Sequence, residues 1–323
     1  MTTIAFLGPT GTFTEQAALQ VAPADAELIP VPSVERALQA VRDGKVDRAV
    51  VAIENSIEGG VNATIDALAH GKPLVIVREM LVEISFCLAV LPGTTDIEFI
   101  GTHPHAWAQC REWVAEHYPN AVHVPTASNA AAAKELAEGD APFQAVLCPE
   151  VSVRQYGLEA IATGVADKAG AVTRFIMVSL PGDLPAPTGA DKTTIQVQID
   201  SDRVGGLLSM LEQFSVRGVN LSRIESRPVG DRLGSYAFSI DIAGHVREER
   251  VQAALVGLHR NHSGLQFFGS YPRVDGQPNT VLPGTSDAAF RDGRQWVADI
   301  LDGTAPLKWS PALGSASTCL GRG

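Results

Sequence analysis

Two hydrophobic periodicities alternate along residues 191–273, and their order limits the possible folds of this 323-residue chain more than any other feature. Alternation with period two, typical of strands, occupies residues 193–199, 219–224, 235–242 and 265–271. Apolar residues at helical spacing occupy residues 204–214 and 246–258. The order strand, helix, strand, strand, helix, strand predicts a ferredoxin-like sandwich of one sheet and two helices.

The composition changes on both sides of this segment. Residues 182–190 are too rich in Pro and Gly for a helix or a central strand, and they predict a linker. After residue 273 the chain becomes rich in Gly, Pro, Ser and Thr, with a helical pattern near residues 288–301. We therefore expect a first domain over residues 1–181, a linker over 182–190, a second domain over 191–273 and a tail over 274–323 with a possible helix.

Strands and helices also alternate through the first domain. Expected strands lie at residues 4–7, 28–31, 49–53, 97–101, 121–124, 145–147 and 174–179, and expected helices lie at 15–21, 34–41, 61–69, 106–116 and 129–137. The pattern predicts an α/β fold with a largely parallel sheet, built as two consecutive α/β sets. Two such lobes leave a cleft between them, with ligand-binding groups at the strand ends.

Polar loops follow four strands of the first domain, at residues 8–12, 54–60, 102–105 and 126–129. The loop at 8–12 opens a helix, so its N–H groups and hydroxyls can cradle an anion, and the lack of a following Gly-Lys-Ser/Thr excludes a nucleotide P-loop. Each loop taken alone also fits a helix N-cap followed by a turn. Their recurrence at the same topological place favours a shared pocket.

Composition and charge exclude several classes of function. The side chains carry a net charge of −11 without any Lys/Arg-rich run interleaved with aromatics, so nucleic acid is not an expected partner. No apolar stretch reaches the roughly 18 residues that span a bilayer, and the N-terminus shows no basic-then-apolar leader, so we expect a soluble, cytoplasmic protein with no membrane partner. The four cysteines show neither a CxxC pair nor zinc-site spacing, so no metal and no disulfide frame is expected.

Four segments resemble, in the same order, the motifs of the prephenate dehydratase family. They are Gly-Pro-Thr-Gly-Thr-Phe-Thr-Glu-Gln-Ala at 8–17, Ile-Glu-Asn-Ser-Ile-Glu-Gly-Gly-Val at 53–61, Thr-His-Pro-His-Ala-Trp-Ala-Gln-Cys at 102–110 and Thr-Arg-Phe at 173–175. Residues 191–273 resemble the ACT module that accompanies this family. The resemblance implies a two-lobed, periplasmic-binding-protein-like catalytic region that converts prephenate to phenylpyruvate, water and carbon dioxide in phenylalanine biosynthesis. No cofactor is expected.

The residues of these motifs form the candidate site. By resemblance, the catalytic residues are Thr173, Arg174 and Phe175, and the substrate-binding residues are Thr10, Gly11, Thr12, Asn55, Ser56, His103, Ser128 and Asn129. Prephenate carries two carboxylates, so we expect Arg174 to grip one in bidentate fashion and Thr173 to donate a hydrogen bond to the departing hydroxyl. Without the resemblance, Thr-Arg-Phe is simply the start of a strand.

Two pairs of ionisable residues allow a structural or a chemical interpretation. His103 and His105 are two positions apart in a Pro-containing loop with no third ligand nearby, which favours a structural or pocket-lining role over a metal. Glu54 and Glu58 could pair as carboxylates, but a dianionic substrate would repel both. Helix capping or backbone contacts are therefore favoured for these two residues.

The second domain carries two candidate effector motifs. Residues Gly205, Gly206 and Leu207 at a helix start, and Glu225, Ser226, Arg227 and Pro228 at a strand end, look like the family's phenylalanine-binding motifs. Taken alone, they would be a Gly-rich turn and a strand end with a surface ion pair. The resemblance implies L-phenylalanine as an allosteric effector bound between paired modules, and hence a homodimer or homotetramer.

The chain departs from the family pattern at Ala171, where Asn is common, and at residues 204–207, where Val-Gly-Gly-Leu replaces the common Pro-Gly-Ala-Leu. A non-catalytic amino-acid-binding sensor is the alternative function, because two α/β lobes around a cleft also describe solute-binding proteins. A sensor would not need Thr173 beside Arg174, and it would usually add a DNA-binding or transmembrane output segment. The enzyme is therefore the favoured interpretation.

Overall fold

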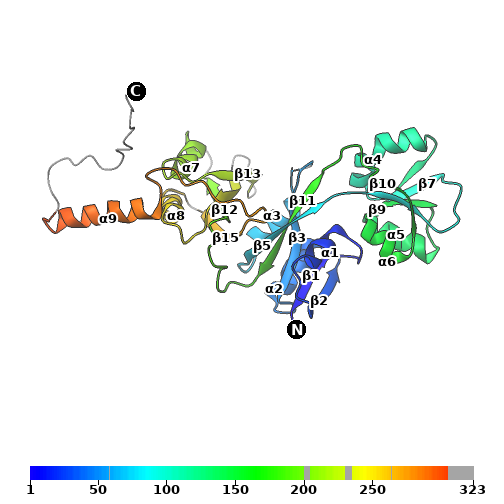
Figure 1. The fold of residues 1–323 in the computed structure, drawn as a ribbon, viewed down its shortest axis with the longest axis horizontal. Helices are drawn as coiled ribbons and strands as arrows, with labels where there is room; N and C mark the ends of the chain where they lie inside the picture. Colours follow the sequence, from blue (N-terminus) through cyan, green and yellow to red (C-terminus); the bar gives the residue numbers. More distant parts are fainter. Residues whose placement is uncertain (58, 200–203, 230–234, 263, 305–323) are drawn as a thin grey trace, which may run out of the picture.

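The computed structural model describes residues 1–57, 59–199, 204–229, 235–262 and 264–304. Glu58 and the tail beyond residue 304 thus lie outside the described residues. Three sheets follow one another along an elongated molecule (Figure 1). We call them lobe 1 (residues 1–83 and 172–180), lobe 2 (residues 87–163) and the C-terminal domain (residues 191–272), and lobe 1 lies in the middle.

Lobe 1 is built on a mixed sheet in the order β2-β1-β3-β11-β5, with the short β4 paired to β3. Its elements are β1 (Thr3–Leu7), α1 (Phe13–Leu19), β2 (Glu27–Val31), α2 (Val34–Arg42), β3 (Arg48–Asn55), β4 (Gly59–Gly60), α3 (Asn62–Ala69), β5 (Val75–Glu83) and β11 (Val172–Ser179). β1 pairs in parallel with β2 and β3, whereas β11 is antiparallel to β3 and β5. The prediction of a largely parallel sheet holds for the direction of β2, β1, β3 and β5 but fails at β11 and the short β4, because the chain leaves lobe 1 through β5 and returns through β11 in the opposite direction.

Helix α2 illustrates how local sequence sets the elements of this lobe. It begins after Ser33, whose hydroxyl accepts a hydrogen bond from the backbone N–H of Arg36 at 3.2 Å. It ends just before Gly44, which has a φ of +67°. The residues that this helix buries recur at helical spacing and face the sheet: they are Val34, Ala37, Leu38 and Val41.

Lobe 2 is a second mixed sheet, in the order β10-β6-β9-β7-β8. Its elements are β6 (Cys87–Val90), β7 (Phe99–Thr102), α4 (Pro104–His117), β8 (Val122–Pro125), α5 (Asn129–Glu138), β9 (Ala145–Cys148), α6 (Glu150–Tyr156) and β10 (Glu159–Thr163). β7 pairs in parallel with β8 and β9, and β6 is antiparallel to β9 and β10. The sequence did not predict β5, β6, α6 or β10. Among these, α6 is only seven residues long and β10 is largely exposed, so neither shows a clear periodicity.

The C-terminal domain is an antiparallel sheet in the order β13-β14-β12-β15. Its elements are β12 (Asp191–Ile199), α7 (Gly206–Ser215), β13 (Leu221–Pro228), β14 (Tyr236–Ala243), α8 (Glu249–Asn261) and β15 (Gly264–Pro272). The chain order is β-α-β-β-α-β, as the periodicities predict. Helices α7 and α8 cover one face of the sheet, where Ile195, Met210, Ile240 and Val251 are buried together.

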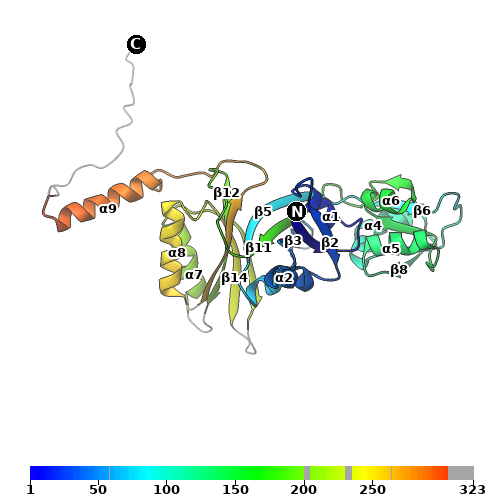
Figure 2. The ribbon, with the colours of Figure 1, turned by 90° about the horizontal axis from the view of Figure 1, so that it is seen from below.

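The other face of the C-terminal sheet packs against lobe 1. Figure 2 shows this sheet with α7 and α8 on one side and the strands of lobe 1 on the other. Strand β15 lies beside β5, and its residues Phe268 and Tyr271 belong to the same buried cluster as Ile76 and Ile176 of lobe 1. The C-terminal domain therefore continues the core of lobe 1 and is not held by the linker alone.

Helix α9 (Asp287–Leu301) extends beyond the C-terminal domain (Figure 1). Ser286 caps its N-terminus by accepting a hydrogen bond from the N–H of Ala289 at 3.2 Å. Arg294 pairs with Glu249 of α8, but no residue of α9 is buried. Within the described ranges, no helix is long and apolar enough to cross a membrane.

Candidate functional site

A cavity of about 220 Å³ lies between lobe 1 and lobe 2, at the carboxyl end of β1 and beside β11. Its lining residues are Leu7, Gly8, Thr12, Phe13, Thr14, Ala52, Ile84, Ser128, Asn129, Ala130, Pro149, Thr173 and Phe175. The volume is somewhat below the roughly 300–1,000 Å³ of pockets for drug-sized ligands, so the cavity suits a small molecule. Among the described residues that line it, none carries a charge.

Thr173 is held in this cavity by a neighbouring strand. Asn55 ends β3, and its amide Nδ2 donates a hydrogen bond to Thr173 Oγ1 at 2.8 Å. The next residue, Ser56, binds the preceding residue of β11: the N–H of Val172 donates to Ser56 Oγ at 2.9 Å, and the N–H of Ser56 donates to the carbonyl of Val172 at 2.9 Å. Because Thr173 accepts from Asn55, its own hydroxyl proton can be donated to a ligand in the cavity.

The N-terminus of α5 forms the opposite wall of the cavity. Ser128 is the N-cap and accepts a hydrogen bond from the N–H of Ala131 at 3.0 Å. The N–H groups of the first turn have no intrahelical acceptor, so this end of the helix carries a partial positive charge. Asn129 Oδ1 accepts from Thr102 Oγ1 at 3.1 Å and from the N–H of His103 at 3.2 Å. The loop with His103 therefore holds the Asn129 side chain by hydrogen bonds, and His103 itself does not line the cavity.

The loop after β1 both lines the cavity and joins the two lobes. Thr12 is the N-cap of α1, accepting from the N–H of Glu15 at 3.2 Å. Thr10 and Gly11, predicted to bind substrate, do not line the cavity. Their carbonyls accept hydrogen bonds from α6 of lobe 2: Tyr156 OH donates to Thr10 at 2.7 Å, and Ser152 Oγ donates to Gly11 at 2.6 Å.

Several residues that line the cavity were not among the site residues predicted from the sequence. Phe13 and Thr14 follow Thr12 within a motif that was noted, so their position was an available signal. Ile84 and Pro149 come from connections whose neighbouring elements, β5 and α6, were not predicted. Nothing in the sequence points to these two. Ala171, where the family commonly has Asn, is buried in the apolar core and is not among the lining residues.

Arg174 points away from the cavity, because successive residues of a strand face opposite sides of the sheet. Its guanidinium binds three carboxylates: Nε lies 3.0 Å from Glu54, Nη1 lies 3.0 Å from Glu79, and Nη2 lies 2.5 Å from Asp241 of the C-terminal domain. Burial by itself lowers the pKa of Arg174, but these carboxylates and Tyr271 raise that pKa well above its ordinary value. The geometry contradicts the predicted grip on a substrate carboxylate.

The candidate effector motifs lie on two elements of the C-terminal domain. Gly205 has a φ of +79° and precedes α7, whose first residue, Gly206, is buried while Leu207 is half exposed. On β13, Arg227 pairs with Asp66 of α3 in lobe 1. Glu225 likewise faces lobe 1, whereas Ser226 and Pro228 are exposed. Half of this motif is therefore engaged with lobe 1.

The residues that the structure describes form no metal site. Within the described part of the chain, no group of three or more His, Cys, Asp or Glu side chains could hold a metal ion. His103 Nδ1 accepts a hydrogen bond from the N–H of His105 at 3.2 Å, and the two rings meet edge to face. Burial raises the pKa of the Cys110 thiol to about 12, so this cysteine stays protonated at neutral pH.

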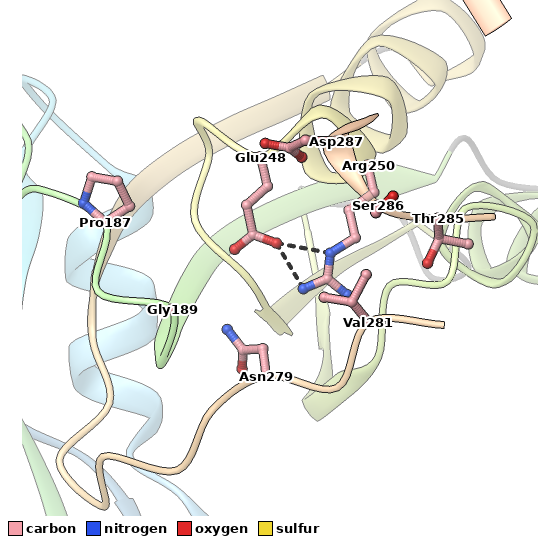
Figure 3. Close-up of a pocket in the computed structure, with 9 residues that line it drawn as sticks. All are labelled: Pro187, Gly189, Glu248, Arg250, Asn279, Val281, Thr285, Ser286 and Asp287. Carbon is pink, nitrogen blue, oxygen red and sulfur yellow. Dashed lines mark hydrogen bonds and ion pairs between the residues drawn. The ribbon is translucent and has the colours of Figure 1, made fainter. Parts of the chain in front are cut away.

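A second cavity, of about 260 Å³, lies where the linker, the start of α8 and the segment before α9 meet (Figure 3). Its lining residues are Pro187, Gly189, Glu248, Arg250, Asn279, Val281, Thr285, Ser286 and Asp287. The Glu248 carboxylate lies 2.7 Å from Nη2 of Arg250, so the buried cation already has a partner. Among the described residues, none of those predicted for a site lines this cavity. We therefore place the candidate chemistry in the first one.

Two mixed α/β lobes around a small cavity with a hydroxyl donor, joined to a β-α-β-β-α-β domain, define a two-lobed α/β protein with an appended ferredoxin-like domain. The family model for prephenate dehydratase matches residues 4–182. The chain belongs to the prephenate dehydratase family.

Relatives in this family match most of the chain. The prephenate dehydratase of Amycolatopsis methanolica is 41% identical over 304 residues, which cover 94% of this chain and 99% of that protein. The crystal structure of prephenate dehydratase from Arthrobacter aurescens in complex with L-Phe has a TM-score of 0.89 and 54% identity, covering 93% of this chain and all of that one. A second structure, of GqqA, described as a novel type of quorum quenching acylase, has a TM-score of 0.75 and 29% identity, covering 84% of this chain and 97% of that one.

Proposed function

We propose that this enzyme converts prephenate to phenylpyruvate, carbon dioxide and water in the cavity between the two lobes. The observation that supports the proposal best is the hydrogen bond from Asn55 to Thr173. It makes the Thr173 oxygen an acceptor, so the Thr173 hydroxyl can donate a hydrogen bond to the leaving group.

The reaction breaks two bonds of the substrate. The bond between the ring and its carboxylate breaks to release carbon dioxide, and its electron pair completes the aromatic ring as the carbon–oxygen bond to the ring hydroxyl breaks. Hydroxide is a poor leaving group, and it departs as water after taking one proton. We assign Thr173 the role of donating a hydrogen bond to this oxygen as charge develops on it, with the proton itself coming from solvent water or from a neighbouring group.

The two substrate carboxylates need donors other than Arg174. We propose that one carboxylate binds at the N-terminus of α5, where Ser128, Asn129 and Ala130 line the cavity and the helix end is partially positive. Thr12, which also lines the cavity, can supply a further hydroxyl. Phe13 and Phe175 provide apolar surface for the ring.

We also propose that the C-terminal domain is an ACT module and that L-phenylalanine is its effector. The relative from Arthrobacter aurescens was crystallised with L-Phe, which supports an amino-acid site in this protein. We place this site at Gly205, Gly206 and Leu207 and at residues 225–228. The reason is that β12 and β13 finish, and β14 begins, at the same end of the sheet. By the resemblance of this domain, the protein pairs as a homodimer or homotetramer. We further propose that it works in the cytoplasm.

One assay tests the reaction and its regulation. Purified protein is given prephenate with and without L-phenylalanine, and phenylpyruvate is measured. We expect phenylpyruvate formation without added metal or cofactor, and inhibition that does not simply raise KM. If prephenate is not consumed, the dehydratase function is wrong. The same preparation should then be tested for acylase activity, since a protein with a similar fold has it.

A further inference from the structure

A buried charged cluster joins the wall of the cavity to the C-terminal domain. We call it the Arg174 cluster, and its members are Arg174, Glu54, Glu79, Lys192, Arg223 and Asp241. Lys192 lies 2.8 Å from Glu79, and Arg223 Nε lies 3.0 Å from the Asp241 oxygen that also binds Arg174. Lobe 1 and the C-terminal domain thus contribute charges of both signs to one network.

Most of the cluster is shielded from water, and only Glu54, at 38% exposed, lies partly at the surface. The side chain of Arg174 is 7% exposed, that of Glu79 is 3% exposed and that of Asp241 is 1% exposed. Buried charges interact strongly and are costly to leave without a partner, so the cluster resists rearrangement. A displacement of one member therefore moves the others.

The cluster reaches Thr173 through neighbouring residues on two paired strands. On β3, Glu54 binds Arg174 and Asn55 binds Thr173, so consecutive residues of one strand hold consecutive residues of the other. The pairing of these strands shifts register just after Arg174. The ladder is irregular at this point, so side-chain contacts contribute more to the position of Thr173 than they would in a regular sheet.

The C-terminal domain touches the same β3–β4 hairpin at a second place. Gly60 pairs with Glu54 in the hairpin, and it packs closely against the carboxylate of Glu225. A Cβ added at Gly60 would come within 1.8 Å of an oxygen of Glu225. Glu225 in turn lies 3.1 Å from Arg223 of the cluster. The C-terminal sheet therefore reaches the hairpin in two ways. Asp241 of β14 acts through Arg174 and Glu54, and Glu225 of β13 contacts Gly60 directly.

We propose that Arg174 is a positioning residue that ties the placement of the C-terminal sheet, through Asp241 and Glu54, to the geometry of Asn55 and Thr173. The C-terminal domain is then part of the support of the catalytic site, even with no effector bound. The kinetic readout of this inference rests on the proposed function.

The first test replaces Asp241, which contacts neither the cavity nor the proposed effector residues of α7. We expect Asp241→Asn to lower kcat about tenfold or more with KM nearly unchanged, since misplacing a reacting group by about 1 Å can cost about 100-fold. The matched control is Thr193→Val. Thr193 is also buried in this sheet, but its hydroxyl bonds Gly244 and Ser270 within the domain. The control should lower the melting temperature and leave kcat unchanged.

A second variant tests the link from the side of lobe 1. Gly60→Ala places a methyl group against the flexible end of Glu225, so the protein should fold while the hairpin shifts. We expect a lower kcat without phenylalanine, and recovery when Glu225→Ala removes the overlap, which is a double-mutant cycle. An unchanged kcat in both Asp241→Asn and Gly60→Ala would overturn the inference.

Hydrogen exchange separates this inference from the proposed reaction. In Asp241→Asn, the amides of residues 172–175 should exchange faster than in the wild type, while those of β1 and β2 should not change. This measurement needs no turnover. If the wild type makes no phenylpyruvate, the proposed function fails, and faster exchange at residues 172–175 still supports the positioning role. Equal exchange in variant and wild type would overturn it.

Discussion

The amide of Asn55 lies 2.8 Å from the hydroxyl oxygen of Thr173 and donates a hydrogen bond to it. This direction is set by chemistry, because an amide nitrogen is a donor whereas a hydroxyl can accept and donate. The contact therefore orients the Thr173 proton toward the cavity. It also makes Thr173 depend on the β3–β4 hairpin, which the C-terminal domain touches at Gly60.

Removing the Thr173 hydroxyl should impair turnover more than binding. We expect Thr173→Ala to lower kcat on the order of 100-fold, about 3 kcal/mol in the barrier, with little change in KM. Thr173→Ser keeps the hydroxyl and should retain most activity. Steady-state kinetics with prephenate measure both variants, and a wild-type kcat in Thr173→Ala would remove this residue from the mechanism.

Changing Asn55 should reverse the hydrogen bond. In Asn55→Asp the carboxylate can only accept, so Thr173 would donate its proton to residue 55 and not to the leaving group. The added charge would also repel a dianionic substrate. We expect Asn55→Asp to lose more kcat than Asn55→Ala, and the opposite ranking would contradict the assigned direction.

The positive φ of Gly205 offers a test of phenylalanine inhibition. Its φ of +79° disfavours any residue with a Cβ, so Gly205→Ala should distort the start of α7 at a cost of about 1–2 kcal/mol. We expect a higher phenylalanine concentration for half inhibition. Gly157→Ala is the matched control, because Gly157 has a φ of +66° and lies in lobe 2. Equal loss of inhibition in both variants would argue against a site at Gly205.

Stability at acidic pH should report on Asp241. Burial raises the pKa of this carboxyl, but Arg174 and Arg223 outweigh burial and hold the pKa well below its ordinary value of about 3.9. A depressed pKa in the folded state contributes stability above about pH 4, and this contribution is lost as the pH falls below that value. The free energy of unfolding of Asp241→Asn should therefore approach that of the wild type as the pH falls from 5 to 3. A constant difference over this range would contradict the prediction.

The secondary structure was predictable wherever periodicity was strong. The whole β-α-β-β-α-β order of the C-terminal domain follows from alternating patterns, and α2 lies between its N-cap Ser33 and Gly44, the residue just after its C-cap. Short elements such as α6 and exposed ones such as β10 carry no such pattern. The antiparallel return of β11 is a property of chain routing between lobes, which no local sequence encodes.

The sequence by itself determined the family motifs, the domain order and the strand at residues 173–175. Strand alternation alone also implies that Thr173 and Arg174 face opposite sides, so both could not have lined one cavity. Only the tertiary structure decided what each of the two side chains contacts. Thr173 lines the cavity between the lobes, and Arg174 binds Asp241, 67 residues away in the chain. The physical reason is that a strand's periodicity sets relative orientation, whereas the partners on each face come from segments distant in sequence.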